Sequence, residues 1–121
     1  GAMSASPHGL VLMLYEGAML AVSAARMHMQ LGQHAEKSRA ISKAVAIISD
    51  GLMASLDRSA GGEIADNLLA LYQYMIEKLT EANVHNRPQP LDEIGRLLAE
   101  LGDAWKSIGR SAPARDATVA A

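Results

Sequence analysis

The sequence predicts an all-α protein, folded as an antiparallel up-down-up-down four-helix bundle. Apolar residues recur at steps of three and four along four stretches of the 121-residue chain. Turn-forming residues separate these stretches, and no segment shows the alternation of period two that is typical of strands. Helices joined by short connections pack most simply as an antiparallel bundle.

The first helix is expected over residues 7–31. Ser6 is a suitable N-cap, Pro7 fits the first helical position, and Gly32 is a suitable C-terminal stop. Small and apolar residues spaced by three and four define the face that should point into the bundle. They are Leu10, Leu14, Ala18, Ala21 and Ala25.

The other three helices are expected over residues 34–56, 63–86 and 91–108. The stretch 57–62 has turn chemistry, and two prolines within 87–90 interrupt the pattern before the last helix. We expect five large residues from the four helices to be among the most buried. They are Leu14, Ile48, Leu71, Leu98 and Trp105.

The chain divides into one folded unit with two short ends. Residues 1–5 contain Gly-Ala-Met, which reads as the remnant of a cleaved expression tag, and a residual N-terminus. Residues 6–109 form the predicted bundle. After Ile108 the composition changes to Gly, Ser, Ala, Pro and Arg, and residues 110–121 are expected to be a flexible tail.

Composition excludes several classes of function. The net charge is −2 and no two Lys or Arg residues are adjacent, so nucleic-acid binding is not expected. No uncharged apolar run approaches the roughly 20 residues of a membrane-spanning helix, so membrane insertion is not expected. The absence of Cys excludes disulfides and thiolate catalysis and suits a reducing cytoplasm. We also expect no cofactor.

The sequence offers no convincing catalytic or metal site, and we expect no enzyme. Glu77, Glu81 and His85 share one face of the third helix, but a single helix supplies no enclosing shell, and a solvated face is the favoured interpretation. Gly61-Gly62 lacks the Gly-Lys-Ser/Thr ending of a phosphate-binding loop. No Gly-x-Ser-x-Gly motif marks a nucleophile.

The apolar residues exceed what a bundle core requires. Residues 10–15 are apolar or aromatic in every direction around the first helix, whereas a bundle helix needs a stripe little wider than 100°. Isolated exposed apolar residues are ordinary, but an excess shared by three helices favours a groove for a partner helix or extended segment. The candidate binding residues are Leu12, Tyr15, Met19, Ile47, Leu69 and Ile76.

Several short motifs, in order, resemble one family. They are ASPH at 5–8, LMLYEGA at 12–18, ASLD at 54–57, GGEIA at 61–65, NL at 67–68, LY at 71–72, YM at 74–75, AN at 82–83 and Trp105. Each is weak alone, but in this order and spacing the set resembles the flagellar export chaperone family FliS.

The resemblance implies a cytosolic helical bundle without enzymatic activity. Members of the family bind the C-terminal segment of newly made flagellin, which is disordered in solution and becomes ordered on the chaperone. Binding blocks premature polymerisation and delivers flagellin to the type III export gate. The alternatives are a structural helical module that forms a homodimer through the same apolar surface and, more distantly, a carboxylate–histidine metalloenzyme.

Members of the family usually carry a longer segment ahead of the Ser6-Pro7 start, and that segment can lie over part of the binding surface. Its absence here predicts self-association through apolar side chains of the first three helices.

Overall fold

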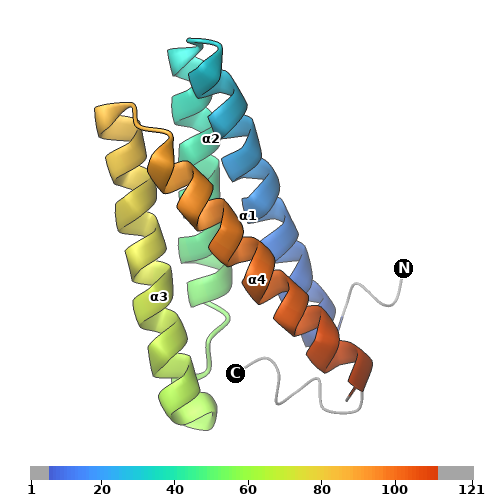
Figure 1. The fold of residues 1–121 in the computed structure, drawn as a ribbon. Helices are drawn as coiled ribbons and strands as arrows, with labels where there is room; N and C mark the ends of the chain where they lie inside the picture. Colours follow the sequence, from blue (N-terminus) through green and yellow to red (C-terminus); the bar gives the residue numbers. More distant parts are fainter. Residues whose placement is uncertain (1–5, 112–121) are drawn as a thin grey trace.

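The structure is a computed structural model that describes residues 6–111, with side chains to residue 109. The predicted remnant at 1–5 and all but the start of the predicted tail at 110–121 lie outside the described residues. The described part consists of helices joined by short connections (Figure 1). They are α1 (Pro7–Gln30), α2 (His34–Ala46), the π-helix η2 (Ile47–Met53), α3 (Arg58–His85) and α4 (Gln89–Ser111).

Consecutive helices run in opposite directions, and η2 continues α2 (Figure 1). Helix α1 packs against α2 and α4, and α3 packs against the same two neighbours. Helix α4 crosses α1 obliquely rather than lying parallel to it (Figure 1). The prediction of an all-α four-helix bundle is confirmed.

The predicted ends of α1 agree with the structure. The Ser6 side chain accepts a hydrogen bond from the Gly9 N–H at 3.0 Å, and Pro7 occupies the first helical position. After the C-cap at Leu31, Gly32 adopts a positive φ of 72°, which glycine tolerates without a steric penalty. The start and stop signals therefore act as their chemistry predicts.

The second helix differs from the uniform α-helix expected over 34–56. Its last part, η2, is a π-helix, and it ends at Met53. A Cβ atom on Gly51 would lie only 2.7 Å from Cδ2 of Leu14, so glycine lets η2 approach α1 closely at this point. Such π-helical segments are rare and are often found at functional sites.

The third helix begins at Arg58 rather than at residue 63. The Asp57 carboxylate caps it by accepting a hydrogen bond from the Ala60 N–H at 3.1 Å. Gly62 then interrupts the helix with φ 57° and ψ −127°, so part of the predicted turn is present as a kink inside α3. Asn86 ends the helix in the left-handed conformation.

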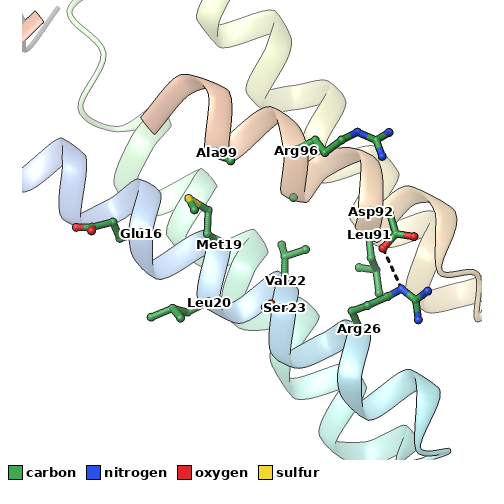
Figure 2. A pocket seen from close by; sticks show the side chains of 11 residues that line it. Glu16, Met19, Leu20, Val22, Ser23, Arg26, Leu91, Asp92, Arg96 and Ala99 are labelled. Carbon is green, nitrogen blue, oxygen red and sulfur yellow. Dashed lines mark hydrogen bonds and ion pairs between the residues drawn. The ribbon is translucent and has the colours of Figure 1, made fainter. Parts of the chain in front are cut away.

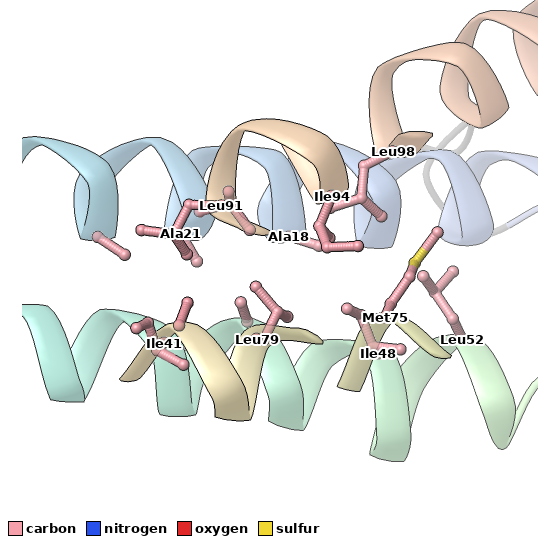
Figure 3. Packing of buried hydrophobic residues seen from close by; sticks show 14 of the residues in the cluster. Ala18, Ala21, Ile41, Ile48, Leu52, Met75, Leu79, Leu91, Ile94 and Leu98 are labelled. Atoms are coloured by element: carbon pink, nitrogen blue, oxygen red, sulfur yellow. The ribbon is translucent and has the colours of Figure 1, made fainter. Parts of the chain in front are cut away.

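The core lies where the pair α1 and α4 faces the pair α2 and α3 (Figure 3). Its members come from all the helices, and the α1 residues at 18, 21 and 25 are alanines. Small side chains allow close packing of neighbouring helices, so the core can be tight with few aromatic residues. The large side chains that are almost completely buried are Tyr15, Ile41, Ile48, Leu52, Tyr72, Met75, Leu79, Leu91, Ile94 and Leu98.

Two predictions about the core are wrong in detail. The inward face of α1 includes Val11 and Tyr15, whereas Leu10 is 49% exposed and Leu14 is only partly buried. Ile48 and Leu98 are fully buried as expected, but the side chains of Leu71 and Trp105 are only partly covered. These partly buried residues pack against the edge of the core instead of its centre.

Helix α1 is long and apolar enough to cross a membrane, judged by length and composition alone. About a third of the relevant stretch is buried inside the bundle. The inner face of α1 therefore explains only part of its apolar character, and the remainder lies on its outer side.

Candidate functional site

The six predicted binding residues do not form one surface. Leu12 and Met19 lie one above the other on α1, where Met19 lines a groove beside α4. Ile47 lies on η2 near Gly17 of α1, since a Cβ at Gly17 would be 3.5 Å from Ile47 Cδ1. Leu69 and Ile76 share a line on α3. The candidate residues thus occupy several sides of the bundle.

Among the six candidate residues, Tyr15 differs most clearly from the prediction, because its side chain is fully buried. Its hydroxyl oxygen lies 2.5 Å from that of Tyr72 and accepts a hydrogen bond from Trp105 Nε1 at 3.1 Å. Three helices, α1, α3 and α4, therefore meet at one polar point inside the apolar core. The expectation that Tyr15 has no neighbour in the bundle is wrong.

Burial keeps both buried tyrosines neutral. Removal from water raises the pKa of Tyr15 above its ordinary value, although the hydrogen bonds with Tyr72 and Trp105 oppose the shift. Burial also raises the pKa of Tyr72, and the neighbouring Tyr15 adds to that effect. Neutral hydroxyls in mutual contact hold the register of three helices, and they offer no activated nucleophile.

Ile47 and Ile76 are also less exposed than expected. Both are partly buried and pack against the core cluster. Leu12 and Leu69 are partly buried as well. Of the six, Met19 borders an open apolar groove, which makes it the best placed to contact a partner.

The groove lies between α1 and α4 and encloses about 720 Å³ (Figure 2). Buried Val22 and Leu91 line it, and Gly95 of α4 leaves it open because it has no side chain. Met19 points across the groove toward α4, whereas Leu20 points away from α4 (Figure 2). We call this the α1–α4 groove. Its complete lining is Glu16, Met19, Leu20, Val22, Ser23, Arg26, Leu91, Asp92, Gly95, Arg96 and Ala99.

Charged side chains border the α1–α4 groove. Arg26 Nε contacts Asp92 Oδ1 at 2.9 Å across one end (Figure 2), with both side chains partly in solvent. An exposed pair of this kind contributes about 1 kcal/mol or less to stability. Glu16 and Arg96 add one charge of each sign, so the border is mixed in charge and the interior is apolar.

A smaller groove of about 430 Å³ lies between the second and third helices. It is more polar, with Ser42, Ser49 and Asp50 on one wall and Thr80 and Asn83 on α3. Around the bundle, this α2–α3 groove lies opposite the α1–α4 groove, because α1 and α4 form one pair of neighbours and α2 and α3 the other. Ile76 lies four residues before Thr80 on the same face of α3, so it continues the α3 wall of the α2–α3 groove.

The described side chains assemble no metal site. Across residues 6–109, no three His, Asp or Glu side chains come together as metal ligands would. Glu81, from the acidic face noted in the sequence, is paired with Lys78 at 3.3 Å and Arg87 at 3.4 Å. His8 packs beside Trp105 with ring centroids 5.8 Å apart, and its Nδ1 is buried with no hydrogen-bond partner.

Sequence reasoning missed the groove as a unit. Its α4 wall consists of small residues, Gly95 and Ala99, which do not attract attention as binding residues. A glycine inside an otherwise helical pattern was the available signal, because it costs helix stability unless a close approach or an open space requires it. A helical bundle with an apolar groove between two of its helices is typical of proteins that bind a partner segment.

Comparisons with known proteins give the family. A family model described as "Flagellar protein FliS" matches residues 1–112. The flagellar secretion chaperone FliS of Salmonella typhimurium is 47% identical over 110 residues, which cover 91% of this chain and 82% of that protein. The FliS of Escherichia coli is 40% identical over 104 residues, covering 86% and 76%. FliSB of Pseudomonas aeruginosa is 43% identical over 104 residues, covering 86% and 82%.

The chain belongs to the FliS family of flagellar secretion chaperones. The resemblance inferred from the ordered motifs is therefore confirmed. The family consists of chaperones rather than enzymes and acts in flagellar export, which implies a flagellar export substrate as partner.

Proposed function

We propose that this chain is a cytosolic chaperone that binds the C-terminal segment of flagellin. Bound in this way, the segment is kept from polymerising early and is handed to the export gate. Membership of a flagellar secretion chaperone family supports the proposal. The α1–α4 groove is the observation that carries it, because an apolar groove beside a helix accepts an amphipathic segment.

The groove accommodates apolar side chains of the segment between Met19 and Gly95. Val22 and Leu91, both buried, form the floor of the groove, and the border of Glu16, Arg26 and Arg96 remains in water. A polar rim around an apolar centre is the usual arrangement of a binding interface. Leu12 extends this contact along α1 by one heptad.

The remaining candidates fit a segment that wraps around the bundle. Ile47, Leu69 and Ile76 lie outside the α1–α4 groove, so one short helix cannot contact all of them together with Met19. We infer that a second part of the segment follows the α2–α3 side. Tyr15 takes no direct part, since its side chain is enclosed by α3 and α4.

A substitution that fills the α1–α4 groove tests the proposal. A Cβ at Gly95 would meet only Val22 Cγ1, at 3.7 Å, so the backbone accepts a side chain and Gly95→Leu would project into the groove. We expect the affinity for a fluorescently labelled C-terminal flagellin peptide, measured by anisotropy, to fall at least tenfold, or about 1.4 kcal/mol. Gly95→Ala, which fills little space, is the matched control and should bind nearly normally.

A second variant separates the two grooves. Ala46→Leu fills the α2–α3 groove and leaves the α1–α4 groove open. A loss with Ala46→Leu and none with Gly95→Leu would move the principal site to the α2–α3 side. Absence of binding by the unsubstituted chain would overturn the flagellin proposal itself.

A further inference from the structure

The thioether of Met19 lies at the edge of the α1–α4 groove, where dissolved small molecules can reach it. Figure 2 shows the side chain extending across the groove toward α4. Its sulfur would lie 3.9 Å from a Cβ atom built on Gly102, which is an ordinary van der Waals distance, so the sulfur rests beside the backbone of α4. The side chain is only partly buried. One side of the sulfur is therefore covered by protein, and the other borders the groove.

The other methionines in the described part of the chain have different surroundings. Met13 and Met27 lie on the outer side of α1 and are 54% and 49% exposed. Met29 and Met75 belong to the core, and Met53 is packed against it. None of these five lines the α1–α4 groove. Among the described methionines, a chemical change at sulfur therefore reaches the groove at one position.

We propose that hydroperoxides oxidise Met19, and that the oxidised side chain makes the α1–α4 groove less apolar and lowers its affinity for the flagellin segment. This regulation rests on the proposed function. The sulfur attacks one oxygen of hydrogen peroxide, so that an S–O bond forms and the O–O bond breaks. The second oxygen leaves as water after it takes the proton of the transferred oxygen. Sulfur is oxidised by two electrons and the peroxide is reduced by two, and the product is the polar sulfoxide.

The α4 wall beside Met19 cannot satisfy the new oxygen. Ala99 and Gly102 have no side-chain donor, and their backbone N–H groups lie within α4, where the helix uses them. The polar members Ser23 and Arg96 are exposed at the border of the groove. In the free chain water hydrates the sulfoxide, but a bound segment removes that water. A polar group covered without a partner opposes binding.

Exposure predicts the order in which the methionines react. The exposed thioethers of Met13 and Met27 should be oxidised first, Met19 next and the fully buried Met75 last. Peptide mass spectrometry of the unsubstituted chain after graded exposure to hydrogen peroxide measures this order. If Met19 stays reduced to the same extent as Met75 after Met13 and Met27 are fully oxidised, the proposed site is wrong.

A matched pair of variants isolates the effect of Met19. The first variant carries Met13→Leu and Met27→Leu, which remove the exposed thioethers, and the second adds Met19→Leu. Leucine is apolar and similar in volume to methionine, and it has no sulfur to oxidise. Each variant is compared with itself before and after peroxide, by anisotropy of the labelled C-terminal flagellin peptide. We expect the affinity of the first variant to fall at least fivefold and that of the second to stay constant.

Two results of this comparison would overturn the proposal. One is an equal loss of affinity in both variants, and the other is no loss in the first variant when mass spectrometry shows that Met19 is oxidised. Methionine sulfoxide reductases of both stereospecificities, supplied with a thiol reductant, should restore the affinity of the first variant. A loss that they do not reverse would overturn the assignment to a sulfoxide. Circular dichroism verifies that oxidation leaves the helices intact.

A dye assay separates failure of this inference from failure of the flagellin proposal. Anilinonaphthalene sulfonate fluoresces on exposed apolar surface. Oxidation should lower its fluorescence with the first variant and leave that of the second unchanged. If the unoxidised chain binds no flagellin peptide, the proposed function fails, and the dye still reports whether oxidation of Met19 alters the groove. Unchanged fluorescence of the first variant with Met19 oxidised would refute that alteration.

Discussion

The side chain that caps α3 is titratable, so its contribution to stability depends on pH. The Asp57 carboxylate accepts hydrogen bonds from the Ser59 hydroxyl at 2.8 Å and from the Ala60 N–H at 3.1 Å. These bonds hold its pKa below the ordinary value of 3.8. A pKa lowered by folding stabilises the native state above the ordinary value, and this contribution is lost as pH falls through the folded-state pKa.

The first prediction follows from that sign. At pH 7 the unsubstituted chain should have a higher thermal midpoint than Asp57→Asn. This difference should shrink below about pH 4, because Asp57 becomes protonated there whereas an asparagine does not titrate. Asparagine also caps helices well, so the variant retains the hydrogen-bond geometry. Thermal unfolding by circular dichroism between pH 7 and pH 2 measures the difference. A difference that stays constant across this range would show that the carboxylate charge is irrelevant.

Gly62 allows a second prediction at the same scale. Its φ of 57° with ψ of −127° is a conformation that L side chains rarely adopt, and no atom lies within 4 Å of a Cβ built there. Gly62→Ala should therefore destabilise the fold by on the order of 1–3 kcal/mol through backbone strain alone. Gly95→Ala is the opposite control, since Gly95 is in regular helix and alanine there should add about 0.5–1 kcal/mol. Denaturant unfolding gives both values, and equal effects would refute the strain argument.

Residue-level prediction from sequence failed where every direction around a helix was apolar. Between Leu10 and Tyr15, periodicity could not say which residue faces inward, and the true inner face differs from the predicted one by a single position. The alanines at 18, 21 and 25 were assigned correctly, because polar neighbours such as Glu16 and Arg26 fix the orientation farther along. Tyr15 was misplaced for this reason.

At the scale of elements, one buried cation joins two helices. Lys37 of α2 is only 4% exposed, and its Nζ donates to the Asn83 carbonyl at 3.2 Å and to Asn86 Oδ1 at 3.1 Å. Positive charge at the C-terminal end of α3 also complements the helix dipole. Ser38 adds a hydrogen bond to Asn83 Oδ1 at 3.0 Å. These hydrogen bonds hold the start of α2 against the end of α3.

The third prediction removes that link. Lys37→Met keeps most of the length of the side chain but leaves the Asn83 carbonyl and Asn86 Oδ1 without this donor, which should cost about 1–3 kcal/mol. Lys43→Met is the matched control, since Lys43 is exposed on the same helix and should change stability by less than about 0.5 kcal/mol. Urea unfolding at neutral pH compares the two. Similar losses in both variants would mean that the buried hydrogen bonds contribute nothing specific.

Elements were predictable in number and order but not in their internal irregularities. Caps and breakers such as Ser6-Pro7 and the prolines at 88 and 90 act locally, so the sequence alone locates the helices near them. The π-helix η2 and the kink in α3 depend on how neighbouring helices pack. Gly51 lies in η2 and Gly62 lies at the kink in α3. A glycine in the sequence does not by itself show whether the chain will form a π-helix or a kink at that position.

At the scale of the whole molecule, the grooves arise from the relation between helices. The α1–α4 groove exists because α4 crosses α1 obliquely (Figure 1) and because Gly95, which has no side chain, lies beside Val22. Neither the crossing nor the resulting gap can be read from the periodicity of one helix. The excess of apolar residues on α1 was visible in the sequence, whereas the fold was needed to show which of them enter the core, which line the α1–α4 groove and which lie on the outer side of α1.

The last prediction concerns the change in heat capacity when the flagellin segment binds. If the flagellin segment orders as its apolar side chains enter the α1–α4 groove, apolar area leaves water and the heat-capacity change must be negative. Calorimetric titration of the C-terminal peptide at several temperatures gives this change as the slope of the binding enthalpy. Gly95→Leu should make the slope less negative where residual binding is measurable, because the side chain already covers part of the groove. Gly95→Ala should retain nearly the natural slope. A slope near zero for the unsubstituted chain would mean that polar contacts at the border dominate, and the apolar groove would no longer explain recognition.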